Sequence, residues 1–336
     1  MYGVKIGCLL INQKRMEQGP TILVNNSSVE GSTFIGMHTF KNGFTVPIYD
    51  LCTTGAFNQI IGHAKFNNRF YGNVYYRGID NLYDNVLPSL MRNRKNGGAN
   101  DLNSILKNVC EDKYLKKSLK LEPFTNDNIK NKKIKRYNRY CVEALLQHYS
   151  GFTRFLDVVD NHWVALWMGL QNFKAHGECN LFYKSYRRII PVEEICESVK
   201  NNKELPQKLY VYILLLAMPF SSKKMNSGII ETKNFVEVDL RKTLPSFYLR
   251  PHAQHALVIR RRDIDDLKHN AKYYDMASQV LGVLRVRIDV AASWIGEGMF
   301  LTQDNLFPSP SIDHGYNNLL KRADLFVHPF TIKKYF

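Results

Sequence analysis

The longest apolar run limits what the chain can fold into more than any other sequence feature. It extends from Tyr210 to Phe220 and falls well short of the roughly 20 residues that a helix needs to cross a bilayer. We therefore expect this run to form a buried strand. Strands alternate with helices along the rest of the chain, which favours an α/β or α+β fold.

Apolar periodicity and capping residues indicate where the elements lie. Short strands and turns are expected over residues 1–50, and further strands at about 73–78, 155–157, 208–217, 235–240, 255–261 and 284–288. Helices are predicted to begin at about Thr54, Asp101, Tyr137, Trp163, Asp263 and Asp289, with a final helix over residues 313–327. We expect the helix at Trp163 to reach Phe173 and the helix at Asp263 to reach about Leu281.

The formal net charge of +16 favours a polyanionic partner such as RNA, DNA or an acidic protein. A background rich in Lys and Asn is the alternative explanation. The most basic stretch is residues 113–139, within an insertion at about 91–139 that we expect to be partly irregular. Aromatic residues are interleaved there, which suits nucleotide stacking, although basic runs are usually solvated faces. The candidate nucleic-acid-binding residues are Lys132, Lys133, Lys135, Arg136, Arg260, Arg261 and Arg262.

The spacing of the cysteines and the absence of several motifs limit the classes of protein to which the chain can be compared. The six cysteines include no Cys-x-x-Cys pair, which is typical of free thiols in a reducing compartment. Residues 1–13 are too short and too polar for a secretory signal, so we expect a cytoplasmic protein without membrane binding. His252 and His255 have no further ligand at metal spacing, so no metal site is expected. P-loop, nucleophile-elbow and dinucleotide-fingerprint motifs are absent, which leaves kinase, α/β-hydrolase and Rossmann functions without support.

Four stretches of the sequence match motifs of a known family and occur in the same order. They are Tyr76-Arg77-Gly78 with residues 86–92, then residues 147–157, residues 250–254 and residues 306–315. On these motifs the chain resembles the FRG domain family over about residues 70–325. Three positions depart from the family pattern: His255 replaces a Gly, Leu257 a Phe and Val159 a Thr.

The same motif order is more loosely similar to that of ADP-ribosyltransferases, which use nicotinamide adenine dinucleotide (NAD). This resemblance implies a split mixed β-sheet flanked by helices, with an ADP-ribosyltransferase-like core. The FRG resemblance divides the chain into an N-terminal strand and helix extension over residues 1–69 and an FRG-like catalytic or binding domain over residues 70–325. A shared motif order is better evidence for a shared fold than for a shared function.

The resemblance implies a set of site residues. The catalytic candidates are Arg77, Thr153, Asp157 and Gln254, and the candidates for binding NAD are Tyr76, Arg77, Gly78, Tyr149 and Arg154. The guanidinium of Arg77 suits phosphate or ribose oxygen atoms, and the alternative is a structural pair with Asp157. Gln254 stands where the transferases usually have Glu. Its amide can hold a ribose hydroxyl but cannot act as a base.

Together these features predict a toxin-like or antiviral defence effector that transfers ADP-ribose from NAD to a nucleic acid, with RNA favoured over DNA. An inhibitory partner protein, as in a toxin–antitoxin pair, would fit such an effector. One alternative is a non-catalytic nucleic-acid- or nucleotide-binding module, which Gln254 favours. Another is a toxin-like subunit held by a partner protein whose acidic surface offsets the excess positive charge.

Overall fold

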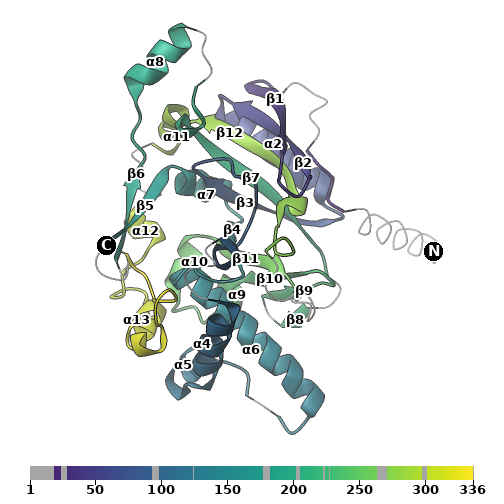
Figure 1. Cartoon of the computed structure of the whole chain (residues 1–336), viewed down its shortest axis with the longest axis vertical. Helices are drawn as coiled ribbons and strands as arrows, with labels where there is room; N and C mark the ends of the chain where they lie inside the picture. Colours follow the sequence, from purple (N-terminus) through teal and green to yellow (C-terminus); the bar gives the residue numbers. More distant parts are fainter. Residues whose placement is uncertain are drawn as a thin grey trace, which may run out of the picture.

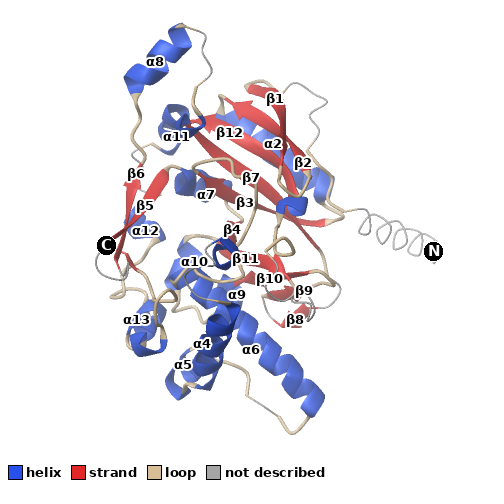
Figure 2. Cartoon of the chain, viewed as in Figure 1, coloured by secondary structure: helices blue, strands red, loops and turns tan. Residues whose placement is uncertain are grey.

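The computed structural model has a ten-stranded mixed sheet at its centre, with helices packed around it (Figures 1 and 2). It describes residues 19–23, 29–92, 98–123, 125–176, 182–201, 205–221, 224–226, 228–262, 271–296 and 301–335. The mixed α/β class and the large sheet flanked by helices confirm the fold class expected from the sequence. Among the helices within these ranges, none is both long enough and apolar enough to span a membrane.

The main sheet combines strands from most of the chain. In spatial order these are β1 (Ser32–Thr39), β2 (Thr45–Leu51), β12 (Val280–Arg287), β7 (Tyr210–Pro219), β3 (Gly72–Ile79), β4 (Leu156–Val159), β11 (Ala256–Arg261), β10 (Phe235–Asp239), β9 (Ile229–Glu231) and β8 (Lys224–Asn226). Neighbours are antiparallel except β2 and β12, which are parallel. A second, three-stranded sheet consists of β13 (Lys334–Tyr335), β6 (Phe182–Arg187) and β5 (Gln171–His176).

The helices pack against this sheet and against one another. They are α2 (Thr54–Asn68), α3 (Ser89–Arg92), α4 (Ala99–Glu111), α5 (Lys113–Ser118), α6 (Asn128–Tyr149), α7 (His162–Gly169), α8 (Val192–Lys200), α9 (Leu240–Thr243), α10 (Leu249–Ala253), α11 (Ile288–Ile295), α12 (Gln303–Leu306) and α13 (His314–Leu320). Helices α4, α5 and α6 gather at the end of the molecule opposite α8 (Figure 1).

The long apolar run is the buried strand β7, as predicted. It lies between β12 and β3, and every residue from Tyr210 to Met218 is buried. A strand in this position is covered on both faces, so apolar residues occur at successive positions without alternation. The run therefore marks the middle of one half of the sheet.

The sheet is nearly divided between β3 and β4. These two strands share a single residue pair, Tyr76 with Val159, whereas β3 pairs with β7 along its whole length. Most of the apolar core on one side of this division involves β7, β12, α2 and α7, and most on the other side involves α4, α6, β10 and β11. The division opens a gap at the middle of the molecule, where the candidate site lies.

Helix α2 forms largely as its sequence predicts. Phe57, Ile60, Ile61 and Ala64 form its buried face. The capping residue is Thr53, one position before the predicted start, and its Oγ1 accepts a hydrogen bond from the backbone N–H of Ala56 at 3.1 Å. Such a cap satisfies a backbone donor that the first turn of a helix leaves without a partner.

The basic stretch at residues 113–139 is more regular than expected. It contains α5 and the first half of α6, which begins at Asn128 rather than at Tyr137. Asp127 explains this earlier start, because its carboxylate accepts hydrogen bonds from the backbone N–H groups of Ile129 and Lys130. The partly irregular excursion expected here is limited to the segment between the two helices, at residues 119–123 and 125–127.

The predicted long helix from Asp263 to about Leu281 is also wrong where the structure can test it. Residues 263–270 lie outside the described residues, and the chain then passes through turns into β12. Asp275 stabilises the turn, because its carboxylate accepts hydrogen bonds from the backbone N–H groups of Ala277 and Val86. Side chains of this type compete with the helix for backbone donors.

Two other predicted helices are too long. The helix predicted to reach Phe173 ends at Gly169, and β5 starts at Gln171. The helix predicted over residues 313–327 ends at Leu320. Apolar residues continue past both helix ends because the following segments are also packed, so periodicity alone does not mark the boundaries.

Candidate functional site

A cavity of about 620 Å³ lies in the gap between β3 and β4. Arg77 enters it from β3, Asp157 from β4 and Gln254 from the end of α10. Gln147, near the end of α6, and Lys333, from the segment before β13, also contribute to the polar lining. Three of the four predicted catalytic residues are therefore brought together, although they are up to 177 positions apart (254 − 77) in the sequence.

Arg77 combines the two roles that the sequence left open. Its Nη1 donates a hydrogen bond to the backbone carbonyl oxygen of Asp157 at 2.7 Å, which ties β3 to β4 where the strands separate. Burial lowers the pKa of Arg77 to about 10, and the nearby charge of Asp157 opposes that decrease. Arg77 is thus still a cation near neutral pH, and it lines the cavity.

The carboxyl group of Asp157 is oriented by a short chain of hydrogen bonds. The hydroxyl of Thr153 donates to Oε1 of Gln147 at 2.7 Å, and Nε2 of Gln147 donates to Oδ2 of Asp157 at 2.5 Å. Burial raises the pKa of Asp157, whereas Arg77 and the bond from Gln147 lower it. Thr153 is fully buried and does not line the cavity. The structure thus places Thr153 behind Gln147 and outside the cavity lining.

Gln254 lies where α10 turns into β11. Its Nε2 donates to the backbone carbonyl oxygen of Leu306 at 2.7 Å, so the acceptor end of the amide can take a ligand hydroxyl. The next residue, His255, has a φ of +52°, a left-handed conformation that glycine adopts at little cost. This conformation accounts for the glycine that is usual at this position in the FRG pattern.

Tyr76 and Gly78 flank Arg77 on β3 and also line the cavity. The ring of Tyr76 is fully buried and packs edge-on against His162, with centroids 5.7 Å apart. Gly78 is needed for close packing, because a Cβ there would lie 1.7 Å from the carbonyl oxygen of Ala165 on α7. The structure thus explains this glycine by its contact with a helix, in addition to its place in the cavity.

We expect Gly78→Ala to lower the free energy of unfolding by about 3 kcal/mol or more, because the added methyl group meets backbone that cannot move independently. Gly62→Ala is the matched control. Gly62 lies in α2, and nothing is within 4 Å of an added Cβ there, so the free energy of unfolding should rise by about 0.5–1 kcal/mol. Urea denaturation of both variants measures these effects. Equal stability of the two variants would contradict the packing argument.

Tyr149 does not reach the cavity. Its ring is fully buried, and its hydroxyl donates to Oδ2 of Asp313 at 2.8 Å. The guanidinium of Arg250 lies over this ring, with Cζ 4.3 Å from the centroid. The structure therefore places Tyr149, a candidate for binding NAD, against a buried arginine and outside the cavity lining.

Arg154 and Arg260 are both buried against one acid, Glu143 of α6. Nη2 of Arg154 lies 2.6 Å from Oε2 of Glu143, and Nη1 of Arg260 lies 3.0 Å from the same oxygen. Both arginines are at most 5% exposed in their side chains. Neither lines the cavity, so the structure places Arg154, a candidate for binding NAD, and Arg260, a candidate for binding nucleic acid, in a buried ion-pair network.

The other predicted basic residues do not form a continuous funnel. Arg136 and Arg262 both form ion pairs with Glu231, at 3.0 and 2.9 Å. Arg261 lies over the ring of Phe235 and donates to the hydroxyl of Ser278. These contacts occupy the guanidinium groups within the protein, which reduces what they can offer a polyanion.

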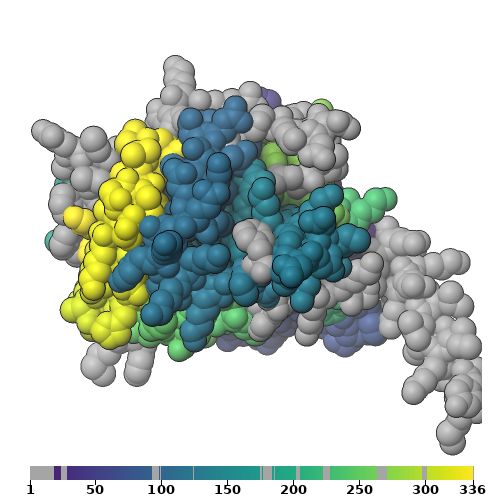
Figure 3. Space-filling view, turned by 90° about the horizontal axis from the view of Figure 1, so that it is seen from below, coloured from purple at the N-terminus to yellow at the C-terminus, as the bar shows by residue number. Residues whose placement is uncertain are grey.

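Lys132, Lys133 and Lys135 are exposed on α6, but they lie far from the cavity. The residues of α6 that line the cavity are Gln147 and His148, and a helix rises about 1.5 Å per residue. Lys135 is therefore about 18 Å along the axis from Gln147. Figure 3 shows α4, α5 and α6 (blue and teal) forming one end of the molecule beside the C-terminal segment (yellow).

Several cavity residues were missing from the predicted site. Lys333 is the most important, and its backbone N–H donates to the carbonyl oxygen of Tyr149 at 2.9 Å. Burial lowers the pKa of the Lys333 ammonium to about 8, while Asp157 opposes that decrease. Beside it, Tyr335 stacks on Phe307 with ring centroids 4.4 Å apart. No sequence motif marks Lys333 or Tyr335, because β13 reaches the cavity through pairing with β6.

We expect the affinity of the cavity for an anionic nucleotide such as NAD to fall roughly tenfold between pH 7 and 9. Lys333 is protonated below a pKa of about 8 and loses its positive charge above it, and a charge-assisted bond contributes about 1.5–3 kcal/mol. Isothermal titration calorimetry against pH measures this change. Lys333→Met should bind weakly at every pH, and Lys132→Met on α6 should follow the wild type. A flat profile for the wild type would contradict the role of Lys333.

Within the described ranges, no cluster of three or more His, Cys, Asp or Glu side chains could hold a metal ion. The candidate site therefore contains cations, amides, carboxylates and aromatic rings. This set can hold a phosphorylated ligand by charge and by hydrogen bonds.

Comparison with known proteins finds a match to one family model, over part of the chain. The model of the FRG domain matches residues 72–178, a span that runs from β3 to the end of β5 and includes Arg77, Gln147 and Asp157. Gln254 and Lys333 lie beyond it. No curated protein and no solved structure matches the chain. The match over residues 72–178 supports the resemblance to the FRG domain family that the sequence motifs indicate.

Proposed function

We propose that the chain binds NAD in the cavity between β3 and β4 and transfers ADP-ribose from it to a nucleic acid, with RNA favoured over DNA. The observation that carries this proposal is the convergence of Arg77, Asp157, Gln254 and Lys333 on one cavity of about 620 Å³. Such an activity fits a toxin or a defence effector, because modified RNA would harm the cell that contains it.

The lining matches the parts of the dinucleotide. Arg77 and Lys333 are the cations for the pyrophosphate, and a guanidinium can hold two phosphate oxygens at once. The stacked rings of Phe307 and Tyr335 offer an aromatic wall to a base or to nicotinamide. The acceptor oxygen of Gln254 suits a ribose hydroxyl.

In the transfer reaction, Asp157 stabilises the developing positive charge and can accept a proton. The bond between C1′ of the nicotinamide ribose and the ring nitrogen breaks, and nicotinamide leaves with the bonding electrons. A bond forms between C1′ and an oxygen or nitrogen atom of the acceptor, which loses a proton. Positive charge develops on the ribose, as in glycoside cleavage, and a fixed carboxylate stabilises it. Because burial raises the pKa of Asp157, this carboxylate can also take the acceptor proton.

A binding module without turnover is the second candidate function. It is favoured by Gln254, which stands where transferases usually have Glu and whose Nε2 is bonded to Leu306. In that case the cavity would hold a nucleotide, and the amide of Gln254 would position it without catalysing a reaction.

Calorimetric titration with NAD tests whether the cavity binds it at all. Arg77→Lys should weaken binding about tenfold or more, because an ammonium cannot replace a bidentate guanidinium. Arg69→Lys is the matched control, since Arg69 is exposed and its Nη1 donates to the carbonyl oxygen of Phe66. The proposal fails if the wild type shows no heat of binding with NAD, or if both variants lose affinity equally.

A further inference from the structure

The hairpin of β5 and β6 presents a basic and aromatic face beside the cavity. Asn172 pairs with Tyr186, and Lys174 pairs with Lys184. Residues that are directly opposite in antiparallel strands lie on the same side of the sheet, so these four side chains share one face. All four are exposed. We call them the hairpin face.

The hairpin face combines a like-charge pair with an aromatic ring that both cations contact. Like charges directly opposite each other on neighbouring strands are destabilising. The Nζ atoms of Lys174 and Lys184 lie 5.5 and 5.7 Å from the centroid of the Tyr186 ring, and within the described part of the chain neither lysine forms an ion pair. Two cations that flank a half-exposed ring match a phosphate backbone with an adjacent base.

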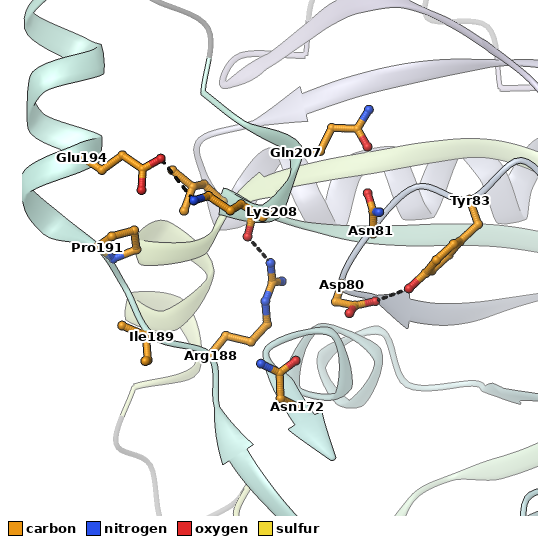
Figure 4. Close-up of a pocket in the computed structure, with 11 residues that line it drawn as sticks. Asp80, Asn81, Tyr83, Asn172, Arg188, Ile189, Pro191, Glu194, Gln207 and Lys208 are labelled. Atoms are coloured by element: carbon orange, nitrogen blue, oxygen red, sulfur yellow. Dashed lines mark hydrogen bonds and ion pairs between the residues drawn. The ribbon is translucent and has the colours of Figure 1, made fainter. Parts of the chain in front are cut away.

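The hairpin face leads into a second cavity of about 620 Å³ (Figure 4). Asn172 lines both this cavity and the first one, as do Asp80 and Tyr83. The second cavity therefore adjoins the candidate NAD site. Its lining contains three carboxamides, Asn81, Asn172 and Gln207, and amides of this type recognise the edges of nucleobases.

The charged residues of the second cavity do not form a phosphate site. Arg188 is buried, and its guanidinium donates to the backbone carbonyl oxygens of Gly169, Tyr210 and Lys208. The ammonium of Lys208 lies 3.5 Å from a carboxylate oxygen of Glu194 (Figure 4). Because these cations are paired within the protein, the cavity suits a neutral base better than a phosphate.

We propose that the hairpin face binds a single strand of nucleic acid and that one unpaired base of this strand enters the second cavity. The lysines contact the backbone phosphates, and Tyr186 stacks on a neighbouring base. A single strand is required because the ring can stack on a base only where that base is not already stacked in a duplex. The inference that this strand accepts ADP-ribose rests on the proposed function, whereas the inference that the strand binds here does not.

Fluorescence anisotropy with a labelled 12-nucleotide single strand, as RNA and as DNA, tests the proposal. The double variant Lys174→Ala/Lys184→Ala should bind about tenfold or more weakly, and its slope of log affinity against log salt should shrink by about 1.4. Tyr186→Leu should lose about 5- to 100-fold. Lys233→Ala/Lys321→Ala is the matched control, with the same loss of charge at exposed positions that line neither cavity, and should bind as the wild type does.

Several outcomes would overturn the assignment. They are the absence of binding, equal losses in the two double variants, binding of a duplex as tight as that of the single strand, and equally tight binding of a polyglutamate peptide of the same charge. Thermal melting checks that the variants fold, and the hairpin double variant should melt close to the wild type, because removal of the repulsive pair offsets the loss of two contacts with the Tyr186 ring.

The proposed reaction and the hairpin face can fail separately. If the wild type binds the strand through the hairpin face but transfers no ADP-ribose to it, the reaction is wrong and the surface stands. If transfer occurs and is unchanged in Lys174→Ala/Lys184→Ala, the reaction stands and the surface is wrong. The affinity for NAD alone should be the same in this variant and in the wild type.

Discussion

We expect Glu143→Gln to lower the free energy of unfolding by about 3–5 kcal/mol. Glu143 is the shared partner of Arg154 and Arg260, and the side chains of all three are at most 5% exposed. The substitution keeps the shape of the side chain and removes its charge, so two buried guanidinium groups lose the anion that offsets their desolvation. Urea denaturation of the purified variant measures the effect.

Glu231→Gln is the matched control for this prediction. Glu231 also has two arginine partners, Arg136 and Arg262, but their side chains are 40% and 36% exposed. Water can therefore solvate these cations when the carboxylate is lost, and we expect a cost of about 1 kcal/mol or less. If Glu143→Gln proved no more harmful than Glu231→Gln, the buried network would not have the structural role assigned to it.

The second large effect concerns the reaction. We expect Asp157→Asn to reduce the rate of ADP-ribose transfer at least about 100-fold, while the affinity for NAD changes less than about threefold. The amide keeps an acceptor for the bond from Gln147, and Arg77 is bonded to the backbone of residue 157, so the local structure should persist. Single-turnover kinetics separate the rate from the affinity.

The pH profile gives an independent check on Asp157. Burial raises its pKa above the ordinary value, and the ionised form is the active one. Activity should therefore fall with decreasing pH at a higher pH than an exposed aspartate would give. Asp160→Asn is the control, because Asp160 is at the surface beside Arg241 and His255 and should leave the transfer unchanged.

The sequence was sufficient to predict elements whose local signals agree with their tertiary environment. The strand β7 and the buried face of α2 are of this kind, because their apolar patterns match the layers that cover them. The predicted helix from Asp263 failed since Asp275 captures backbone N–H groups that a helix would need. The early start of α6 depends on the Asp127 cap, which a composition rich in Lys and Asn obscured.

The residues of the candidate site that lie in family motifs could be predicted from the sequence. Arg77, Asp157 and Gln254 lie in shared motifs, and the structure places all three at one cavity. Burial was not predictable for Arg260, because an arginine in a basic run looks like a surface residue until Glu143 is placed beneath it. Lys333 had no signal at all, since its position depends on the pairing of β13 with β6.

Transfer of label from NAD tests the central claim most directly. Purified protein would be incubated with adenylate-labelled NAD and, separately, with total RNA, DNA and lysate protein, alongside the Arg77→Ala, Asp157→Asn and Gln254→Ala variants. We predict label on RNA, with the signal lost in Arg77→Ala and Asp157→Asn and reduced in Gln254→Ala. Absence of label from every polymer, while NAD still binds, would contradict ADP-ribose transfer and would identify the cavity as a nucleotide-binding site without turnover.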